Sequence, residues 1–258
     1  MVRLIDAHIH LSDPEYEPIL DVLKQMVDKM DIILIAVSED LATSERTLQL
    51  ADRWGEKVIP FVGIHPWSVK EDPDLDLDNY RDFLNRERDR IKGIGEIGLD
   101  KGYVGDEGSY QLQKRVFNSL LEVAEKYKWP VSVHSRNSQS EVIDILSTYS
   151  LKSVLLHWFS GGVEDLNRSI DRGYFISFGP SLIYSKKAQI LAKNTPKELI
   201  LVESDGPVRY KACFEGRIGL PTFIPSVIFA LTSILKMEYA TIASMIYENS
   251  KRYLLEGI

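Results

Sequence analysis

The sequence of 258 residues carries 38 acidic and 31 basic side chains, for a net charge of −7, and 44% of its residues are hydrophobic. That composition is ordinary for a chain with a buried core and excludes global disorder, while the single cysteine, Cys213, excludes a disulfide scaffold. The negative balance argues against charge-driven coating of DNA or membranes, but not against an enzyme that binds a polyanion through local cations or metal ions.

No stretch of the sequence approaches the roughly 18 consecutive apolar residues of a membrane-spanning helix. The first residues, Met1 to Asp6, leave no room for the long apolar segment of a signal peptide. We therefore expect a cytoplasmic protein with no membrane partner. No Gly-x-Gly-x-x-Gly or Walker loop follows an apolar run, so we expect no nucleotide cofactor. The sequence does not indicate an oligomeric state.

Eight short runs rich in β-branched residues recur along the chain, and each is followed by a polar loop and an amphipathic stretch. The runs are nearly all apolar rather than alternating, which is typical of parallel strands buried on both faces. They are Leu4–Ala7, Ile32–Val37, Val58–Gly63, Lys92–Ile97, Val131–His134, Ser153–His157, Tyr174–Phe178 and Leu199–Glu203.

Apolar residues at helical spacing fill the segments between these runs. The first helix is predicted after Ser12-Asp13-Pro14, a cap with proline in the first turn, and Pro130 is predicted to stop a later one. Eight β–α units without a Pro/Gly/Ser-rich linker predict a (β/α)8 TIM-like barrel, one domain over residues 1–258. The longest irregular stretch, Gly206–Pro221, is long enough to indicate a function.

All the histidines lie at or just past the C-terminal end of a predicted strand. They are His8, His10, His65, His134 and His157. In a barrel these strand ends converge on one mouth, where active sites are built. A lone histidine at such a place is usually hydrogen-bonded or solvent-facing, but the joint placement of all five favours a common site.

The pair His8 and His10 can act as a clamp for a cation. The two residues are two apart on one strand, so both imidazoles point to the same side, and imidazole suits zinc, iron, nickel and copper. Glu96, on the fourth strand, has two oxygens and can bridge two cations.

Three more residues can complete a binuclear centre. His134 and His157 can hold a second ion, and Asp205 can complete the first site. Two ions about 3.5–4 Å apart make a shared water nucleophilic at neutral pH. Asp205 is also a candidate to take the proton of that water and pass it to the leaving group, so we treat Asp205 and Glu96 as the catalytic candidates.

A donor set of four imidazoles and two carboxylates also constrains the metal. Magnesium prefers all-oxygen shells, whereas imidazole-rich sites suit transition metals. We therefore expect two divalent ions, zinc or manganese, with magnesium, iron and nickel as alternatives. The competing mechanism, a Ser/His/Asp triad, is disfavoured: Ser135, Ser160 and Ser204 adjoin motif residues, but none lies in a Gly-x-Ser-x-Gly elbow.

Six segments, in order along the chain, resemble the signatures of the TatD family of metal-dependent hydrolases, which belongs to the amidohydrolase superfamily and is often described as deoxyribonucleases. The segments are Asp6-Ala7-His8-Ile9-His10-Leu11, Gly63-Ile64-His65-Pro66-Trp67, Gly95-Glu96-Ile97-Gly98-Leu99-Asp100, His134-Ser135-Arg136, His157-Trp158-Phe159-Ser160-Gly161-Gly162 and Glu203-Ser204-Asp205-Gly206-Pro207. The segment Glu248–Leu254 resembles the closing motif of the family.

The resemblance implies a TIM-like barrel with a one- or two-metal hydrolytic site. It assigns to the first ion His8, His10, Glu96 and Asp205, and to the second Glu96, His134 and His157. His65 resembles a family histidine on the substrate side of the pocket, which implies a phosphate or oxyanion partner rather than a ligand.

Three loops depart from the family pattern. Trp158 stands where the family usually has a small residue or cysteine, and Lys101-Gly102-Tyr103 replaces an aromatic pair. The loop Gly216–Pro221 keeps Arg217 but lacks an Asn-Glu pair. These departures leave the metal shell intact and fall in loops, where specificity is set.

Phosphate and base contacts can also be placed on the sequence. Arg136 and Arg217 are candidate substrate-binding residues beside His65, because a guanidinium gives phosphate two parallel hydrogen bonds. Arg209 and Lys211 are further candidates, and all four compete with an interpretation as solvated loop charges. The aromatic residues that can either stack a base or pack in the rim are Trp67, Trp158 and Phe159.

These features predict a metal-dependent hydrolase, first of all a deoxyribonuclease-type phosphodiesterase. A narrow barrel mouth admits a chain end more readily than a mid-duplex phosphate, so we expect an exonuclease acting on DNA ends or single strands. The alternative is hydrolysis of an ester, amide or lactone, including deacylation of misacylated tRNA, because the same activated water attacks C=O. A metal-binding protein without turnover is disfavoured, because every ligand position is filled.

Overall fold

The structure is a computed structural model that describes residues 3–71, 76–104 and 106–255. Its sheet has eight strands that pair in chain order, each parallel to the next. The strands are β1 (Leu4–Ile9), β2 (Ile32–Ala36), β3 (Val58–Val62), β4 (Gly93–Gly98), β5 (Val131–His134), β6 (Val154–Leu156), β7 (Phe175–Phe178) and β8 (Ile200–Val202). This arrangement confirms the predicted (β/α)8 barrel.

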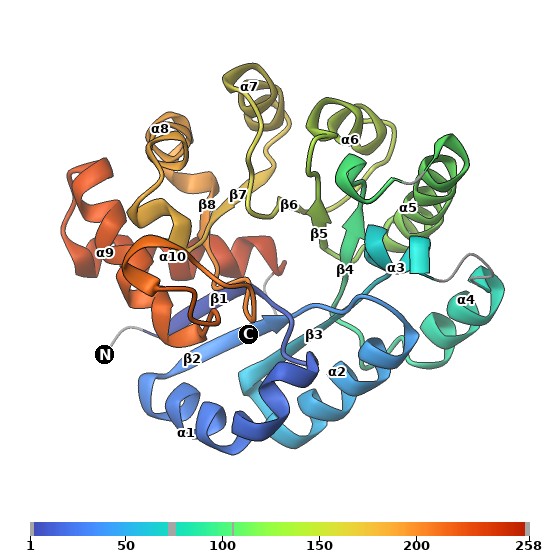
Figure 1. Ribbon diagram of the computed structural model, residues 1–258, viewed down its shortest axis with the longest axis horizontal. Coiled ribbons are helices and arrows are strands. Elements are labelled where there is room, and N and C mark those ends of the chain that lie inside the picture. Colours follow the sequence, from blue (N-terminus) through green and yellow to red (C-terminus); the bar gives the residue numbers. More distant parts are fainter. Residues whose placement is uncertain (1–2, 72–75, 105, 256–258) are drawn as a thin grey trace.

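Helices surround the strands as an outer layer (Figure 1). The described residues form α1 (Leu20–Met30), α2 (Leu41–Trp54), α3 (Pro66–Glu71), α4 (Leu77–Arg86), α5 (Glu107–Tyr127), α6 (Gln139–Leu146), α7 (Val163–Asp171), α8 (Lys186–Asn194), α9 (Ile224–Leu235) and α10 (Tyr239–Tyr253). No single helix among them is long and apolar enough to cross a membrane. Pro221–Leu235 and Tyr239–Tyr253 satisfy that test only together, as a pair bent by 110°.

Local sequence signals explain where the helices begin and end. Asp106 starts α5, because its carboxylate accepts a hydrogen bond from the backbone N–H of Ser109. Lys128, just before Trp129-Pro130, ends α5 in the left-handed conformation. The helix predicted after Ser12-Asp13-Pro14 begins as a 3-10 turn over Pro14–Ile19 and becomes α-helical only at Leu20.

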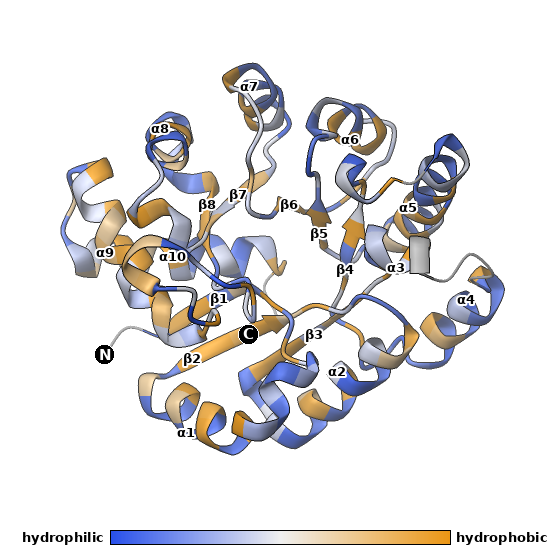
Figure 2. Cartoon of the chain, viewed as in Figure 1, coloured by the Kyte–Doolittle hydropathy of each residue, from blue (hydrophilic) through white to orange (hydrophobic). Residues whose placement is uncertain are grey.

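The alternation of side chains along each strand builds two apolar layers. On β2, Ile33 and Ile35 point into the barrel, while Ile32 and Leu34 pack outward under the helices. Tyr253 of α10 joins the interior layer and is fully buried. In Figure 2 the strands are mostly hydrophobic, whereas the helices mix hydrophobic and hydrophilic residues, as expected for helices with one face on a barrel.

The first and last strands meet at the mouth of the barrel. The backbone N–H of Asp205 donates to the carbonyl of His8 at 2.9 Å, and the N–H of His10 donates to the carbonyl of Gly206 at 2.9 Å. The buried carboxylate of Asp6 accepts from the N–H of Ser204 at 2.8 Å. This seam brings the two ends of the predicted ligand set into direct contact.

Candidate metal centre

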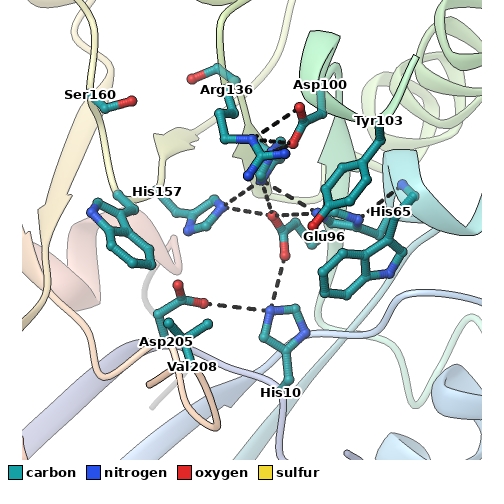
Figure 3. A pocket seen from close by; sticks show the side chains of 14 residues that line it. His10, His65, Glu96, Asp100, Tyr103, Arg136, His157, Ser160, Asp205 and Val208 are labelled. Carbon is teal, nitrogen blue, oxygen red and sulfur yellow. Dashed lines mark hydrogen bonds and ion pairs between the residues drawn. The ribbon is translucent and has the colours of Figure 1, made fainter. Parts of the chain in front are cut away.

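The side chains predicted to bind metal converge at the mouth, although they come from five different strands or the loops that follow them. They are His8, His10, Glu96, His134, His157 and Asp205. Figure 3 shows several of them turned toward one another with Glu96 in the middle. Most of the set lies at the base of a cavity of about 480 Å³.

The first group of donor atoms consists of two imidazole nitrogens and two carboxylate oxygens. Glu96 Oε2 lies 3.2 Å from His8 Nε2 and 3.1 Å from His10 Nε2. Asp205 Oδ1 lies 3.6 and 3.5 Å from the same nitrogens, which are 3.3 Å apart. A tetrahedron with metal–ligand bonds of about 2.1 Å has edges of about 3.4 Å, so these spacings fit one small cation.

The second group uses the other oxygen of the same glutamate. Glu96 Oε1 lies 2.8 Å from His134 Nδ1 and 2.7 Å from His157 Nε2. The two nitrogens are 3.3 Å apart. Glu96 therefore presents one oxygen to each donor group, which is the arrangement of a bridging carboxylate.

Carboxylates outside the pocket orient two of the histidines. His134 Nε2 donates to Asp100 Oδ2 at 2.7 Å, so the neutral ring would carry its lone pair on Nδ1, which faces Glu96. His10 Nδ1 lies 3.0 Å from Glu39 Oε1, so the neutral ring would carry its lone pair on Nε2, which faces inward. Neither role is predicted from the sequence, although Asp100 ends a motif segment.

The remaining two predicted histidine ligands differ in their outer surroundings. His8 Nδ1 is 2.9 Å from the hydroxyl of Ser132 on β5, and His157 Nδ1 is 3.9 Å from Glu203 Oε2. Both contacts leave Nε2 toward the pocket. Metal-binding histidines are usually held by an outer hydrogen bond, which His8 has, whereas His157 Nδ1 is buried without a hydrogen-bond partner among the described residues.

His65 differs from the other histidines in the ring nitrogen that carries its hydrogen. The backbone N–H of Trp67 donates to His65 Nδ1 at 3.2 Å, so the neutral ring carries its hydrogen on Nε2. That nitrogen lies 3.3 Å from Glu96 Oε1 and 3.4 Å from His134 Nδ1. His65 therefore borders the second donor group as a hydrogen-bond donor, whereas each of the other four histidines turns toward the pocket a nitrogen that would offer a lone pair once its ring is neutral.

The electrostatics of the pocket favour cations. Burial opposes ionisation of Glu96, but the surrounding His157, His65 and His8 hold its pKa well below the usual range. Asp205 is likewise buried, and its hydrogen bond with His10 keeps its pKa low. Both carboxylates are therefore ionised.

The histidine pKa values differ within this site. Burial, with the nearby His157, lowers the pKa of His8 to about 4, so this ring is neutral and ready to coordinate. Burial opposes the charge on His157 as well, but Glu96 raises its pKa to about 9. A divalent cation that binds here replaces the proton on His157, because a ligating imidazole must be neutral.

The predicted substrate-binding arginines lie in different environments. Arg136 lines the cavity, with Nε 2.9 Å from Asp100 Oδ2 and its guanidinium 4.6 Å from the centre of the Tyr103 ring. The Arg217 side chain is 74% exposed, lies 3.6 Å from Glu215 and does not line this cavity. The loop therefore turns Arg217 away from the donor groups.

The other candidates for phosphate and base contacts also differ in whether they line the cavity. Arg209 pairs with Glu15 at 2.5 Å, and Lys211 is exposed and absent from the cavity wall. Phe159 is buried in the hydrophobic core, so its packing role is the correct one. Trp67 and Trp158 line the cavity.

A parallel eight-stranded barrel with a histidine–carboxylate cluster at its mouth defines the class of metal-dependent barrel hydrolases. The family model described as TatD related DNase matches residues 5–255, so the chain belongs to this family. A human relative named deoxyribonuclease TATDN3 is 33% identical over 215 residues, covering 80% of this chain and 78% of the relative.

Two further relatives match almost end to end. The uncharacterized metal-dependent hydrolase YabD of Bacillus subtilis is 26% identical over 255 residues, covering 96% of this chain and 98% of the relative. The solved structure of YjjV, a TatD homolog from Escherichia coli, has a TM-score of 0.89 and 24% identity, with 98% of each chain covered. The protein is a metal-dependent hydrolase with a TatD-type barrel, as the sequence predicts.

Replacing Asp100 by Asn is expected to weaken metal binding about 10- to 100-fold, because the amide no longer fixes the His134 tautomer as a carboxylate does. Competition with a chromogenic chelator measures the affinity. Asp144→Asn on α6, which changes an exposed carboxylate, is the matched control. Equal affinities of the two variants would contradict the orienting role of Asp100.

Proposed function

We propose that this enzyme hydrolyses phosphodiester bonds in DNA, removing nucleotides from ends or short single strands with the help of two divalent ions. The observation that carries the proposal is Glu96, whose two oxygens face two separate donor groups. The human relative bears the name deoxyribonuclease, which supports DNA as the substrate class. The cavity of about 480 Å³ has the size of a nucleotide rather than of a duplex, which favours action at chain ends.

The donor set favours zinc or manganese over magnesium, because each of the two donor groups around Glu96 contains two imidazoles. His8, His10, Glu96 and Asp205 would hold one ion, and Glu96, His134 and His157 the other. Divalent ions in these positions would polarise the phosphoryl group and lower the pKa of an attacking water.

Asp205 is the proposed general base. Its backbone is fixed by the hydrogen bond to His8, with φ at +46°, and its buried carboxylate is ionised. As the water oxygen forms a bond to phosphorus, the carboxylate takes one proton from that water. When the bond to the leaving oxygen breaks, Asp205 returns this proton to that oxygen.

His65 and Arg136 are proposed to stabilise the phosphoryl oxygens. The His65 Nε2–H points to the region of Glu96 and His134, where a non-bridging oxygen would gain negative charge. Arg136 is held by Asp100 on the cavity wall and can place its remaining N–H groups on the same phosphate. Arg217 is no longer proposed for this role, because it lies outside the cavity.

The test is release of labelled mononucleotides from end-labelled single-stranded DNA by protein loaded with zinc or manganese. A covalently closed single-stranded circle of similar length is the matched control, because it has no end. We expect cleavage of the linear strand and an intact circle. An intact linear strand, together with hydrolysis of a carboxylic ester or amide, would overturn the proposal.

Removal of metal is expected to destabilise the protein, because the binding energy of each ion contributes to the folded state. Saturating zinc or manganese should raise the Tm of the chelator-treated protein by about 5–15 °C. Differential scanning calorimetry measures the shift, and elemental analysis of untreated protein gives the ion count. A Tm that responds to magnesium but not to zinc or manganese would refute the metal assignment.

A further inference from the structure

The metal donors occupy the base of the cavity, and aromatic side chains form its walls. Trp158 follows His157 directly and lines the cavity together with Val208. Trp67 and Tyr103 also line it, and Figure 3 shows Tyr103 beside His65. We propose that the Trp158 indole is the platform on which the nucleobase next to the cleaved phosphate stacks. This inference rests on the proposed function and names the part of the substrate that the site reads.

The backbone of Trp158 is anchored to buried polar groups. Its N–H donates to Glu203 Oε1 at 2.9 Å and lies 3.2 Å from the hydroxyl of Ser177. Its φ is +36°, a left-handed backbone conformation that is unfavourable for a residue other than glycine. Trp158 therefore has an unfavourable backbone conformation, and the hydrogen bonds from its N–H to Glu203 and Ser177 hold the backbone in it.

The indole itself is supported from the protein side. The Tyr210 ring lies 5.6 Å from the Trp158 ring, at an interplanar angle of 38°. Tyr210 is buried, and its hydroxyl donates to the carbonyl of Ser204 at 2.7 Å, so this support is rigid. Trp158 remains partly exposed in the cavity, which gives a fixed, flat apolar surface beside the metal donors.

The neighbouring aromatic residues have other partners. Phe159 is buried in the core, and the Trp67 ring packs against His65 at 4.2 Å and against Tyr103 at 5.6 Å. The Tyr103 ring is covered by Arg136. The Trp158 ring, by contrast, packs on Tyr210, which is not among the residues that line the cavity. Stacking on such a surface tolerates any base, because every base has a π face.

The experiment compares two labelled oligothymidylates, one with normal ends and one whose terminal nucleotides are tetrahydrofuran residues that lack a base. Wild-type protein loaded with manganese should cleave the base-bearing ends with a kcat/KM about 10-fold or more higher. Trp158→Ala should lower kcat/KM on base-bearing ends by about 10- to 100-fold, mainly through KM, and should largely remove the preference. Trp158→Phe should restore much of it.

Trp129→Ala is the matched control, because Trp129 also packs on a tyrosine, Tyr127, but does not line the cavity. If Trp158→Ala does not fold, Trp158→Leu keeps an apolar side chain without a π face. Equal losses on both substrates, or no preference in the wild type, would overturn the stacking role and leave the phosphodiesterase proposal standing. Failure of the wild type to cleave either substrate would overturn both.

Discussion

Glu96→Gln is expected to lower kcat/KM on single-stranded DNA by about 10³-fold or more. Glutamine keeps the volume of the side chain, but its amide nitrogen is no metal donor and it removes the negative charge. Because Oε2 faces His8 and His10 while Oε1 faces His134 and His157, one substitution damages both donor groups. Elemental analysis should show the loss of at least one ion.

The matched control for this substitution is Glu87→Gln, which changes a carboxylate that pairs with Arg86 and Arg90 far from the cavity. It should retain wild-type kcat/KM and metal content. If Glu96→Gln kept both ions and activity within a few-fold of the wild type, the bridging role of Glu96 would be wrong.

Asp205→Asn is expected to lower kcat by about 10²- to 10⁴-fold, because an amide cannot accept the proton of the attacking water. The side chain also belongs to the first donor group, so metal content must be measured on the same sample. A proton-transfer role predicts that kcat stays low even at metal concentrations that saturate the variant. Recovery of full kcat with excess metal would show that Asp205 acts only as a ligand.

The control for Asp205→Asn is Asp171→Asn at the end of α7, where the carboxylate is exposed. This variant should match the wild type in kcat, KM and ion content. A comparable loss of kcat in both variants would point to a general effect of lost negative charge rather than to general-base catalysis.

The barrel could be predicted from the sequence because its strands are buried on both faces and read as continuous apolar runs. The predicted run Lys92–Ile97 differs from β4 by one residue at each end, and Leu4–Ala7 stops two residues short of the end of β1. The strand continues through His8 because its side chain points into a buried pocket. A polar residue near the end of a strand interrupts the apolar run, so the sequence places the end of the strand too early.

The outer partners of the histidines could not be predicted in the same way. Glu39 follows β2 and meets His10, while Glu203 follows β8 and faces His157. Each pairing depends on the rotation of an imidazole ring and joins elements distant in sequence. The tautomer of His65 depends on one hydrogen bond, from the backbone N–H of Trp67, and no residue pattern predicts this bond.

The path of the long loop after β8 could not be predicted from the sequence either. Arg217 is a phosphate candidate because the late loop keeps this arginine near the predicted mouth and a guanidinium suits phosphate, but the loop folds back on itself through a bridge between Arg209 and Ile218. Gly219 also donates its N–H to the carbonyl of Val208 at 2.7 Å. The Arg217 side chain is exposed and is not among the residues that line the cavity, so proximity in sequence to Asp205 does not place it on the cavity wall.

The seam between β1 and β8 also governs when the enzyme can become active during biosynthesis. Consider a ribosome-bound chain from which only the first six strands and His157 have emerged. It contains Glu96, His134 and His157, but it lacks Asp205 and the backbone hydrogen bond that fixes Asp205 beside His8. An unfinished polypeptide therefore lacks the proposed general base and part of the proposed first donor group. In the proposed mechanism, hydrolysis would start only after the residues that follow β8 have emerged and bonded to His8 and His10.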